Sequence, residues 1–314
     1  MNRRRFCARL ARTNQSNNMK SVVAAAVLTL VATAASAEQV KIKWIGDYSH
    51  NRDAVYSPED KYRSGLSRNF LNGAPEEGGK VQRDGVLSAE LLKPKGSSGP
   101  LPFVILMHGC SGLTRPVQKW ADEKADIFLS HGYGVLILDS FTTRHVKAVC
   151  GEGDYHWGLR RAEDAYSALN YLIENKIADK SRVFVMGRSN GGSAALQIGN
   201  AIMSDDHQYG FAMIFAVSPG CAGLDRSTFV RPTVIFIGDK DQANDPKKCE
   251  QLEVHGPIRF VLYPGVNHGF EDKGPAYVFH GWRMEYNAKA DTETIDQVLA
   301  LMANPKDFKA SKER

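Results

Sequence analysis

The sequence has few cysteines, and none of the arrangements in which cysteine and histidine usually bind a metal. It contains five cysteines in 314 residues, no Cys-x-x-Cys pair, and no His/Cys cluster with the spacing of a zinc site. We therefore expect neither a structural metal nor a cofactor in this chain.

Apolar runs long enough for a comfortable membrane span are also missing. The run over residues 22–35 has 14 residues, whereas a bilayer-crossing helix needs about 20. It follows six basic and no acidic residues and ends in Ala35-Ser36-Ala37. This pattern predicts a cleaved secretory signal over residues 1–37, with a retained N-terminal anchor as the alternative. Either Met1 or Met19 can be the start, and Arg3-Arg4-x-Phe6 leaves a twin-arginine signal open.

Such cleavage would leave a chain with almost no net charge. The full sequence has 40 Lys plus Arg and 35 Asp plus Glu, so removing six basic residues leaves 34 minus 35, or −1. A chain without a basic excess is not expected to bind nucleic acid. We expect residues 38–314 to form a single α/β domain, exported to the periplasm or secreted, with no stable membrane span. The sequence carries no signal for an oligomeric state.

Export would place the cysteines of residues 38–314 in an oxidising compartment. The four cysteines there are Cys110, Cys150, Cys221 and Cys249. An even number in that setting favours disulfides. We favour Cys110–Cys150 with Cys221–Cys249, because each pair would join loops at the ends of strands expected to be neighbours. Four free buried thiols are the alternative.

Apolar runs alternate with amphipathic helical stretches, which is typical of a mostly parallel sheet with helices on both faces. The expected strands cover residues 86–92, 103–107, 134–138, 183–186, 212–217, 233–237 and 259–262. The expected helices cover residues 120–130, 158–175, 246–253 and 287–302, with another beginning near Gly191. The polar, turn-rich segment 48–83 is expected to be irregular, either a surface connection or a lid, and residues 94–102 a hairpin or a loop.

The expected strand at residues 183–186 runs into Gly187-Arg188-Ser189-Asn190-Gly191. A side chain at the apex of a tight turn between strand and helix is held in a strained conformation, and only small residues two positions away leave room for it. The N–H groups at the start of the following helix point toward a developing oxyanion. The motif therefore predicts Ser189 as a nucleophile.

A serine hydroxyl needs a base to remove its proton and a carboxylate to orient that base. In this architecture both follow the serine in the chain, each in a loop after a later strand. His268 is the favoured base, with His280 as the alternative. For the acid we favour Asp241 over Asp239, because Asp239 directly follows the strand and is better placed to hydrogen-bond the turn.

Two backbone amides are expected to stabilise the oxyanion. One is the amide of Asn190, which follows the nucleophile. The other is the amide of Cys110 in His108-Gly109-Cys110, after the strand at residues 103–107. We expect His108 to brace this loop and not to act as a base.

Candidate substrate-binding residues are less specific. Arg144 and Arg188 can bind a substrate carboxylate through paired hydrogen bonds, but we favour an arginine with a structural partner or in solvent. Aromatic side chains that can line an apolar acyl site, with burial in the core as the alternative, are Phe141, Trp157, Phe270 and Trp282.

Six ordered segments resemble the dienelactone hydrolase family of the α/β-hydrolase fold over roughly residues 85–302. They are Ile105-Leu106-Met107-His108-Gly109-Cys110-Ser111-Gly112-Leu113, Asp139-Ser140-Phe141, Arg161-x-x-Asp164-Ala165, Gly187-Arg188-Ser189-Asn190-Gly191-Gly192, Gly238-x-x-Asp241 and Tyr263-Pro264-Gly265-x-x-His268-Gly269-Phe270. The resemblance implies a nucleophile at Ser189, an acid at Asp241 and a base at His268, in agreement with the argument above.

This chain differs from dienelactone hydrolases proper, which carry cysteine as the nucleophile and are cytosolic. With serine at position 189 we expect a hydrolase that acts on a small carboxylic ester or lactone through an acyl-enzyme. One alternative is a serine peptidase of the prolyl-oligopeptidase type, which usually adds a large second domain. The other is a binding protein with this fold and no catalysis.

Overall fold

A computed structural model describes residues 36–45, 84–150, 154–205 and 207–313. All of them fall within one compact unit, residues 34–314. The predicted irregular segment 48–83 lies outside the described residues, as do residues 1–35 of the predicted signal.

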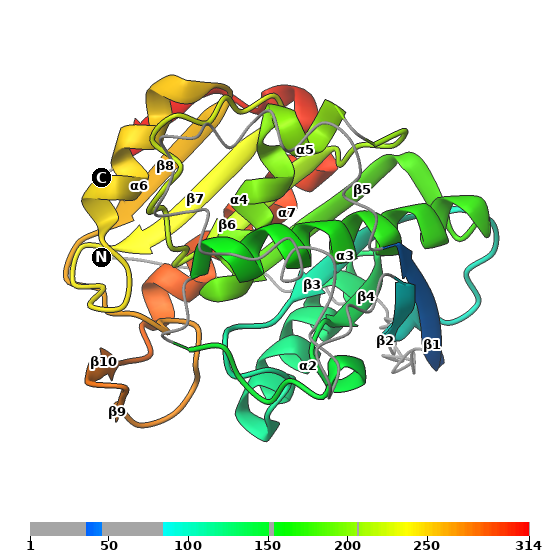
Figure 1. The fold of residues 1–314 in the computed structure, drawn as a ribbon, viewed down its shortest axis with the longest axis horizontal. Coiled ribbons are helices and arrows are strands. Elements are labelled where there is room, and N and C mark those ends of the chain that lie inside the picture. Colours follow the sequence, from blue (N-terminus) through cyan, green and yellow to red (C-terminus); the bar gives the residue numbers. More distant parts are fainter. Residues whose placement is uncertain (1–35, 46–83, 151–153, 206, 314) are drawn as a thin grey trace, which may run out of the picture. The chain divides into compact units, whose positions relative to one another are not determined.

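The described part of the chain forms a nine-stranded sheet in the order β1-β2-β4-β3-β5-β6-β7-β8-β11 (Figure 1). β1 pairs antiparallel with β2, and β2 pairs antiparallel with β4, whereas every other pairing in this sheet is parallel. The strands are β1 (Ser36–Ile45), β2 (Asp84–Lys93), β3 (Leu101–Met107), β4 (Gly134–Asp139), β5 (Ala178–Arg188), β6 (Met213–Val217), β7 (Thr233–Gly238), β8 (Ile258–Tyr263) and β11 (Ser311–Glu313).

Helices cover both faces of the sheet, as predicted. The helices are α2 (Arg115–Ser130), α3 (Asp154–Glu174), α4 (Asn190–Gly199), α5 (Ala201–Asp205), α6 (Pro246–Glu250) and α7 (Ala288–Ala303). Single 3₁₀ turns are η2 (Thr142–Arg144), η3 (Gln251–His255) and η4 (Pro305–Asp307). A separate hairpin consists of β9 (Tyr277–Phe279) and β10 (Trp282–Met284).

Strand pleating divides the apolar core into two layers. Successive side chains of a strand point to opposite faces of the sheet, so Ile105 of β3 packs in the layer under α3 and α4, while Leu106 packs in the layer under α2 and α7. β5 alternates in the same way at Val185 and Met186. Both faces of the central strands are therefore buried, which explains why they appear as continuous apolar runs in the sequence.

The seven predicted strands are present, but the sequence prediction missed β1. Its side chains alternate, with Val40, Ile42 and Trp44 buried and Lys41 and Lys43 exposed. This period-2 pattern is typical of an outer strand with one face on the core, but the prediction assigned the adjoining residues to a signal. The predicted cleavage point after Ala37 falls two residues into β1.

Residues 94–100 form a loop, one of the two predicted forms, and a hairpin is excluded because β4 lies between β2 and β3 in the sheet. The start of one helix differs from the prediction. α2 begins at Arg115, earlier than the predicted residue 120, because Pro116 is at a first-turn position where its missing N–H costs nothing.

The neighbouring strands β3 and β5 are followed by helices on opposite faces of the sheet. β3 leads to α2 on one face of the sheet and β5 leads to α4 on the other. In an open parallel sheet such a divergence leaves a crevice at the carboxyl ends of the two strands. Both predicted oxyanion segments and Ser189 lie at this point.

Candidate active site

Ser189 occupies a strained turn between β5 and α4. Its φ and ψ are 51° and −123°, outside the regions that non-glycine residues usually adopt. A Cβ atom at Gly187 would lie 2.1 Å from the carbonyl oxygen of Gly191, and one at Gly191 would lie 2.3 Å from that of Met107. Both glycines are thus required by close backbone approach, and the turn leaves Ser189 partly exposed.

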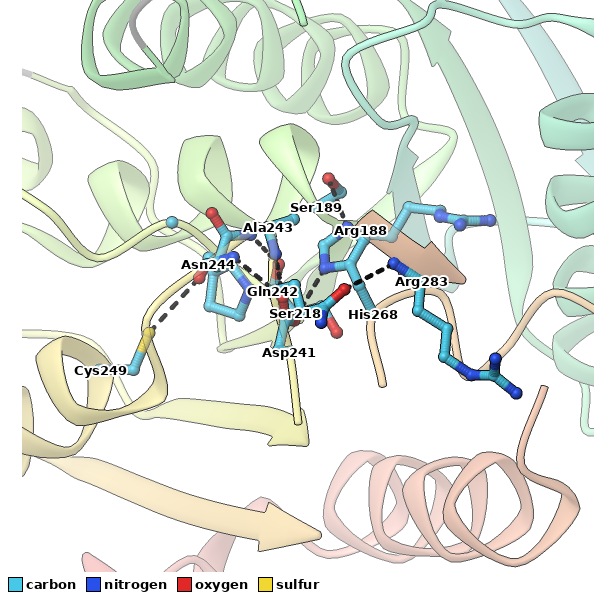
Figure 2. Close-up of polar contacts among 12 residues, drawn as sticks. Arg188, Ser189, Ser218, Asp241, Gln242, Ala243, Asn244, Cys249, His268 and Arg283 are labelled. Atoms are coloured by element: carbon cyan, nitrogen blue, oxygen red, sulfur yellow. Dashed lines mark hydrogen bonds and ion pairs between the residues drawn. The ribbon is translucent and has the colours of Figure 1, made fainter. Parts of the chain in front are cut away.

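Ser189, His268 and Asp241 form a hydrogen-bonded row (Figure 2). His268 Nε2 lies 3.0 Å from Ser189 Oγ, and His268 Nδ1 lies 2.7 Å from Asp241 Oδ2. His268 and Asp241 are both buried. The structure therefore brings together the three side chains expected from their order along the chain.

Asp241 is held by its own loop. Its Oδ1 accepts hydrogen bonds from the backbone N–H groups of Ala243 at 3.0 Å and Asn244 at 2.9 Å, which leaves Oδ2 for His268. Asp239 instead accepts from the N–H of Gly265 at 2.6 Å, the turn-stabilising contact expected of it. The alternative base, His280, lies exposed in the turn between β9 and β10, 4.5 Å from the Phe279 ring centre.

Arg161 hydrogen-bonds to both predicted oxyanion segments, the loop after β3 and the start of α4. It is fully buried in α3 and donates from Nη1 to Asn190 Oδ1 at 2.6 Å and from Nη2 to the carbonyl oxygen of His108 at 2.5 Å. Gly109 lies against the Ser189 turn, since a Cβ atom there would be 3.6 Å from Ser189 Cβ. One guanidinium thus fixes the loop after β3 relative to the start of α4.

His108 is buried and braces the same loop. Its Nδ1 lies 2.8 Å from the carbonyl oxygen of Gly109, and its ring packs edge-on against Phe141. Burial, reinforced by the charge of Arg161, lowers the pKa of His108 to about 3. The imidazole therefore remains neutral at physiological pH.

A cavity of about 590 Å³ opens beside Ser189 and His268, a size typical of small-molecule sites. Its walls are the predicted oxyanion loop (residues 108–114, after β3), the first half of α2 and the segment from Glu271 through the β9–β10 hairpin. Its apolar side chains include Val117, Trp120, Phe279, Trp282 and Met284.

Arg144 does not contribute to this cavity. It is buried, and its two terminal nitrogens donate to Asp164 at 2.7 and 2.6 Å. Burial raises the pKa of Asp164, but the charge of Arg144 and its hydrogen bonds outweigh this effect and hold the pKa below its usual range. The structure thus contradicts the possible role of Arg144 as a substrate ligand and shows the structural pairing that was favoured, an ion pair between η2 and α3.

Arg188 does line the cavity, but it is also paired. Its Nη2 donates to Asp272 Oδ2 at 2.8 Å and its Nη1 contacts Asp272 Oδ1. Burial lowers the pKa of Arg188, but the negative charge of Asp272 outweighs burial, so the pKa is raised above its usual value.

The structure describes the side chains of three of the four predicted aromatic residues. Of these, Trp282 lines the cavity. Phe270 is completely buried and packs against Tyr263 in the core, and Phe141 is buried beside His108, so neither is placed in the cavity wall. The side chain of Trp157 lies outside the described part of the structure.

Both favoured disulfides are present. Cys110 and Cys150 have Cα atoms 4.9 Å apart, and Cys221 and Cys249 have theirs 5.0 Å apart. The first attaches the predicted oxyanion loop to the chain beyond η2. The second attaches the loop after β6 to α6.

The sequence prediction missed a buried hydrogen bond in the cavity wall, between Trp120 and Glu271. Trp120 Nε1 donates to Glu271 Oε1 at 2.9 Å, across 151 residues of sequence. Glu271 lies three residues after His268, in a stretch that had no recognisable motif, so only the fold reveals its position.

None of the helices in the described part of the chain is both long and apolar enough to cross a membrane. Within residues 36–45, 84–150, 154–205 and 207–313, no group of three or more His, Cys, Asp or Glu side chains could hold a metal ion.

The sheet topology and the strained turn at Ser189 together define an α/β hydrolase. Comparisons with known proteins agree. The dienelactone hydrolase family model matches residues 87–305, and the chain belongs to this family. A search of curated protein sequences found no significant match.

Three solved structures are similar in fold. A putative dienelactone hydrolase from Klebsiella pneumoniae subsp. pneumoniae MGH 78578 has 16% identity and a TM-score of 0.53, covering 74% of this chain and 97% of that one. A dienelactone hydrolase-like promiscuous phosphotriesterase from metagenomic libraries has 16% identity and a TM-score of 0.52, with coverage of 85% and 98%. The carboxylesterase Cest-2923 from Lactobacillus plantarum WCFS1 has 12% identity and a TM-score of 0.52, with coverage of 70% and 94%.

Proposed function

We propose that this hydrolase cleaves small carboxylic esters or lactones through an acyl-enzyme on Ser189. The observation that carries the proposal is the hydrogen-bonded row in which Ser189 Oγ lies 3.0 Å from His268 Nε2 and His268 Nδ1 lies 2.7 Å from Asp241. These distances fall within the range expected of a nucleophile, its base and the group that orients the base.

In the first half of the reaction, Ser189 Oγ attacks the carbonyl carbon of the ester while its proton passes to His268 Nε2. The tetrahedral oxyanion accepts hydrogen bonds from the amides of Cys110 and Asn190. The C–O bond to the alcohol then breaks, and the alcohol leaves with the proton from His268.

In the second half, a water molecule attacks the acyl carbon and gives its proton to His268. The bond between Ser189 Oγ and the acyl group breaks, Ser189 recovers the proton, and the carboxylic acid leaves. Asp241 accepts a hydrogen bond from His268 Nδ1 and so keeps His268 in the tautomer with its proton on that nitrogen.

The test combines covalent labelling with kinetics. A fluorophosphonate should form an adduct at Ser189, and Ser189→Ala should lower kcat for p-nitrophenyl butyrate by several orders of magnitude, on the order of 10⁶-fold as in a well-studied triad enzyme. Ser181→Ala is the matched control, because Ser181 is exposed at the other end of the same strand. Full turnover by Ser189→Ala would refute the proposal, and a chain that neither labels nor turns over any ester would favour a binding protein.

We also propose that the enzyme is exported. The predicted signal supports this proposal, and so do the two disulfides, because disulfides persist mainly in oxidising compartments. Expression of the full chain should yield a protein beginning near Glu38 in the periplasm or medium, as N-terminal sequencing can show. A retained leader in a membrane fraction would contradict the proposal.

A further inference from the structure

The charged side chains around the cavity include three cations and three carboxylates, apart from His268. Within the described residues that line the cavity, the cations are Lys119, Arg188 and Lys273, and the carboxylates are Glu123, Glu271 and Asp272. Their pairing determines which charges a substrate encounters next to Ser189.

Arg188 is the buried cation of this set. Its side chain is 6% exposed, compared with 64% for Lys119 and 47% for Lys273. A buried guanidinium is the strongest site in such a cavity for a substrate anion, because water does not screen it. Figure 2 shows the Arg188 side chain extending from the end of β5, away from Asp241.

Asp272 occupies the hydrogen-bond donors of Arg188 that could otherwise bind a substrate anion. Both terminal nitrogens of Arg188 contact the two carboxylate oxygens of Asp272, and the hydroxyl of Tyr277 donates to Asp272 Oδ2 at 3.3 Å. Burial raises the pKa of Asp272, but Arg188 and these hydrogen bonds outweigh it and lower the pKa below its usual value. Arg188 also lies over the Trp120 ring, 5.2 Å from its centre.

The other two cations are exposed and share one carboxylate. Lys119 and Lys273 both lie near Glu123, at 3.5 and 3.1 Å, so one positive charge is left over in solvent that screens it. Glu271 accepts the indole N–H of Trp120, and burial raises its pKa against the opposing charges of Arg188 and Lys124, which favours the neutral acid. Among the described residues that line the cavity, no buried cation is left without a carboxylate partner.

An anionic substrate would therefore meet Asp272 wherever it approached Arg188. It would have to break a buried ion pair or lie beside a second carboxylate, and each is costly. An uncharged group meets no such barrier and can pack against Trp120, Phe279 and Trp282.

We propose, on the basis of the hydrolase function above, that the cavity accepts an uncharged apolar or aromatic part of the ester, and that Asp272 is a specificity-determining residue that excludes carboxylate-bearing substrates by neutralising Arg188.

Two pairs of substrates that differ in one carboxylate test this selectivity. The acyl side is tested by p-nitrophenyl pentanoate against mono-p-nitrophenyl glutarate, with the background hydrolysis of each subtracted. The alcohol side is tested by 4-acetylphenyl butyrate against 4-carboxyphenyl butyrate. For the side that enters the cavity, the wild-type enzyme should prefer the uncharged member about 10- to 100-fold in kcat/KM.

Asp272→Asn preserves the shape of the side chain and releases the charge of Arg188. The preference for the uncharged ester should fall at least tenfold in that pair. Asp296→Asn is the control, since it removes the same charge from an exposed position on α7 and should leave the preference at the wild-type value. Asp272→Ser replaces the Asn variant if circular dichroism shows that the latter does not fold.

The inference is overturned if wild-type ratios are within about threefold of one for both pairs, or if the folded Asp272 variant keeps the wild-type preference. Labelling of Ser189 and turnover of the uncharged esters separate this result from failure of the proposed function. An enzyme that turns over both members equally contradicts only the selectivity, whereas one without labelling or turnover contradicts the hydrolase proposal itself.

Discussion

The two walls that flank Ser189 are built differently. On one side, the predicted oxyanion loop is fixed by Arg161 from α3 and by the Cys110–Cys150 disulfide. On the other side, the β9–β10 hairpin has Tyr277 46% and Val278 72% exposed, and it contacts the site through few bonds, such as that from the N–H of Arg283 to Gln242 at 2.8 Å (Figure 2).

This difference separates two requirements of catalysis. Groups that stabilise a transition state must stay within a fraction of an ångström of their positions, and buried charged hydrogen bonds and covalent links provide that precision. Groups that contact the rest of the substrate need shape more than precision. We therefore expect changes to the cross-linked wall to lower kcat, and changes to the hairpin wall to alter KM and selectivity.

Among changes to the two walls, the largest effect is expected at Arg161, which contacts both predicted oxyanion segments. Arg161→Met should lower kcat for an uncharged ester by about 10²-fold, comparable to loss of one oxyanion donor, while KM changes less than threefold. Arg161→Lys, which can reach only one acceptor, should have a kcat between those of Arg161→Met and the wild type. Steady-state kinetics with a parallel thermal melt measures this, and a folded Arg161→Met enzyme with normal kcat would contradict the bracing role.

The two disulfides allow a matched comparison in which we expect an effect of intermediate size. They close loops of 40 and 28 residues in sequence separation, and loop-closure entropy predicts about 4 kcal/mol of stabilisation for each. Replacing Cys110 and Cys150 together by alanine should therefore lower both stability and kcat, the latter about tenfold, because the oxyanion loop loses its anchor.

Replacing Cys221 and Cys249 by alanine should lower stability by a similar amount and leave kcat within twofold of the wild type. Denaturant unfolding and kinetics on the two double variants provide the measurement. Equal loss of kcat in both would show that the disulfides act only on global stability.

The smallest effect is expected in the hairpin. Trp282→Ala should raise KM for an aromatic or branched uncharged ester by about three- to tenfold, since a half-buried ring is lost from the cavity wall. The melting temperature should barely change. Val278→Ala serves as the control, because Val278 lies outside the cavity lining and is mostly exposed. A fall in kcat with KM unchanged would mean that the hairpin orients the reacting groups after all.

The strand pattern and the row of Ser189, Asp241 and His268 could be predicted because both depend on local sequence and chain order. Buried strands produce apolar runs, and a tight turn requires glycine at fixed positions. The choice of Asp241 over Asp239 also follows from its distance along the loop, and the structure places Asp239 in the turn contact expected of it.

Partners of the arginines could not be predicted in this way. Arg144 meets Asp164 and Arg188 meets Asp272 across 20 and 84 residues of sequence, and an unpaired arginine has the same local sequence as a paired one. The hairpin wall was missed because strands of three residues are too short to show a period. Its position depends on contacts with the Asp241 and His268 loops.

The first strand also protects the sheet from other chains. β1 covers the outer side of β2 over a ten-residue register, and the guanidinium groups of Arg144 and Arg160 lie over its Trp44 ring, 4.6 and 3.7 Å from the ring centre. Without it, the backbone of β2 would form an open edge on which a second sheet could assemble. β1 itself presents Lys41 and Lys43 to solvent, and such charges discourage edge-to-edge pairing. The residues that immediately follow the predicted cleavage point thus guard the folded enzyme against aggregation.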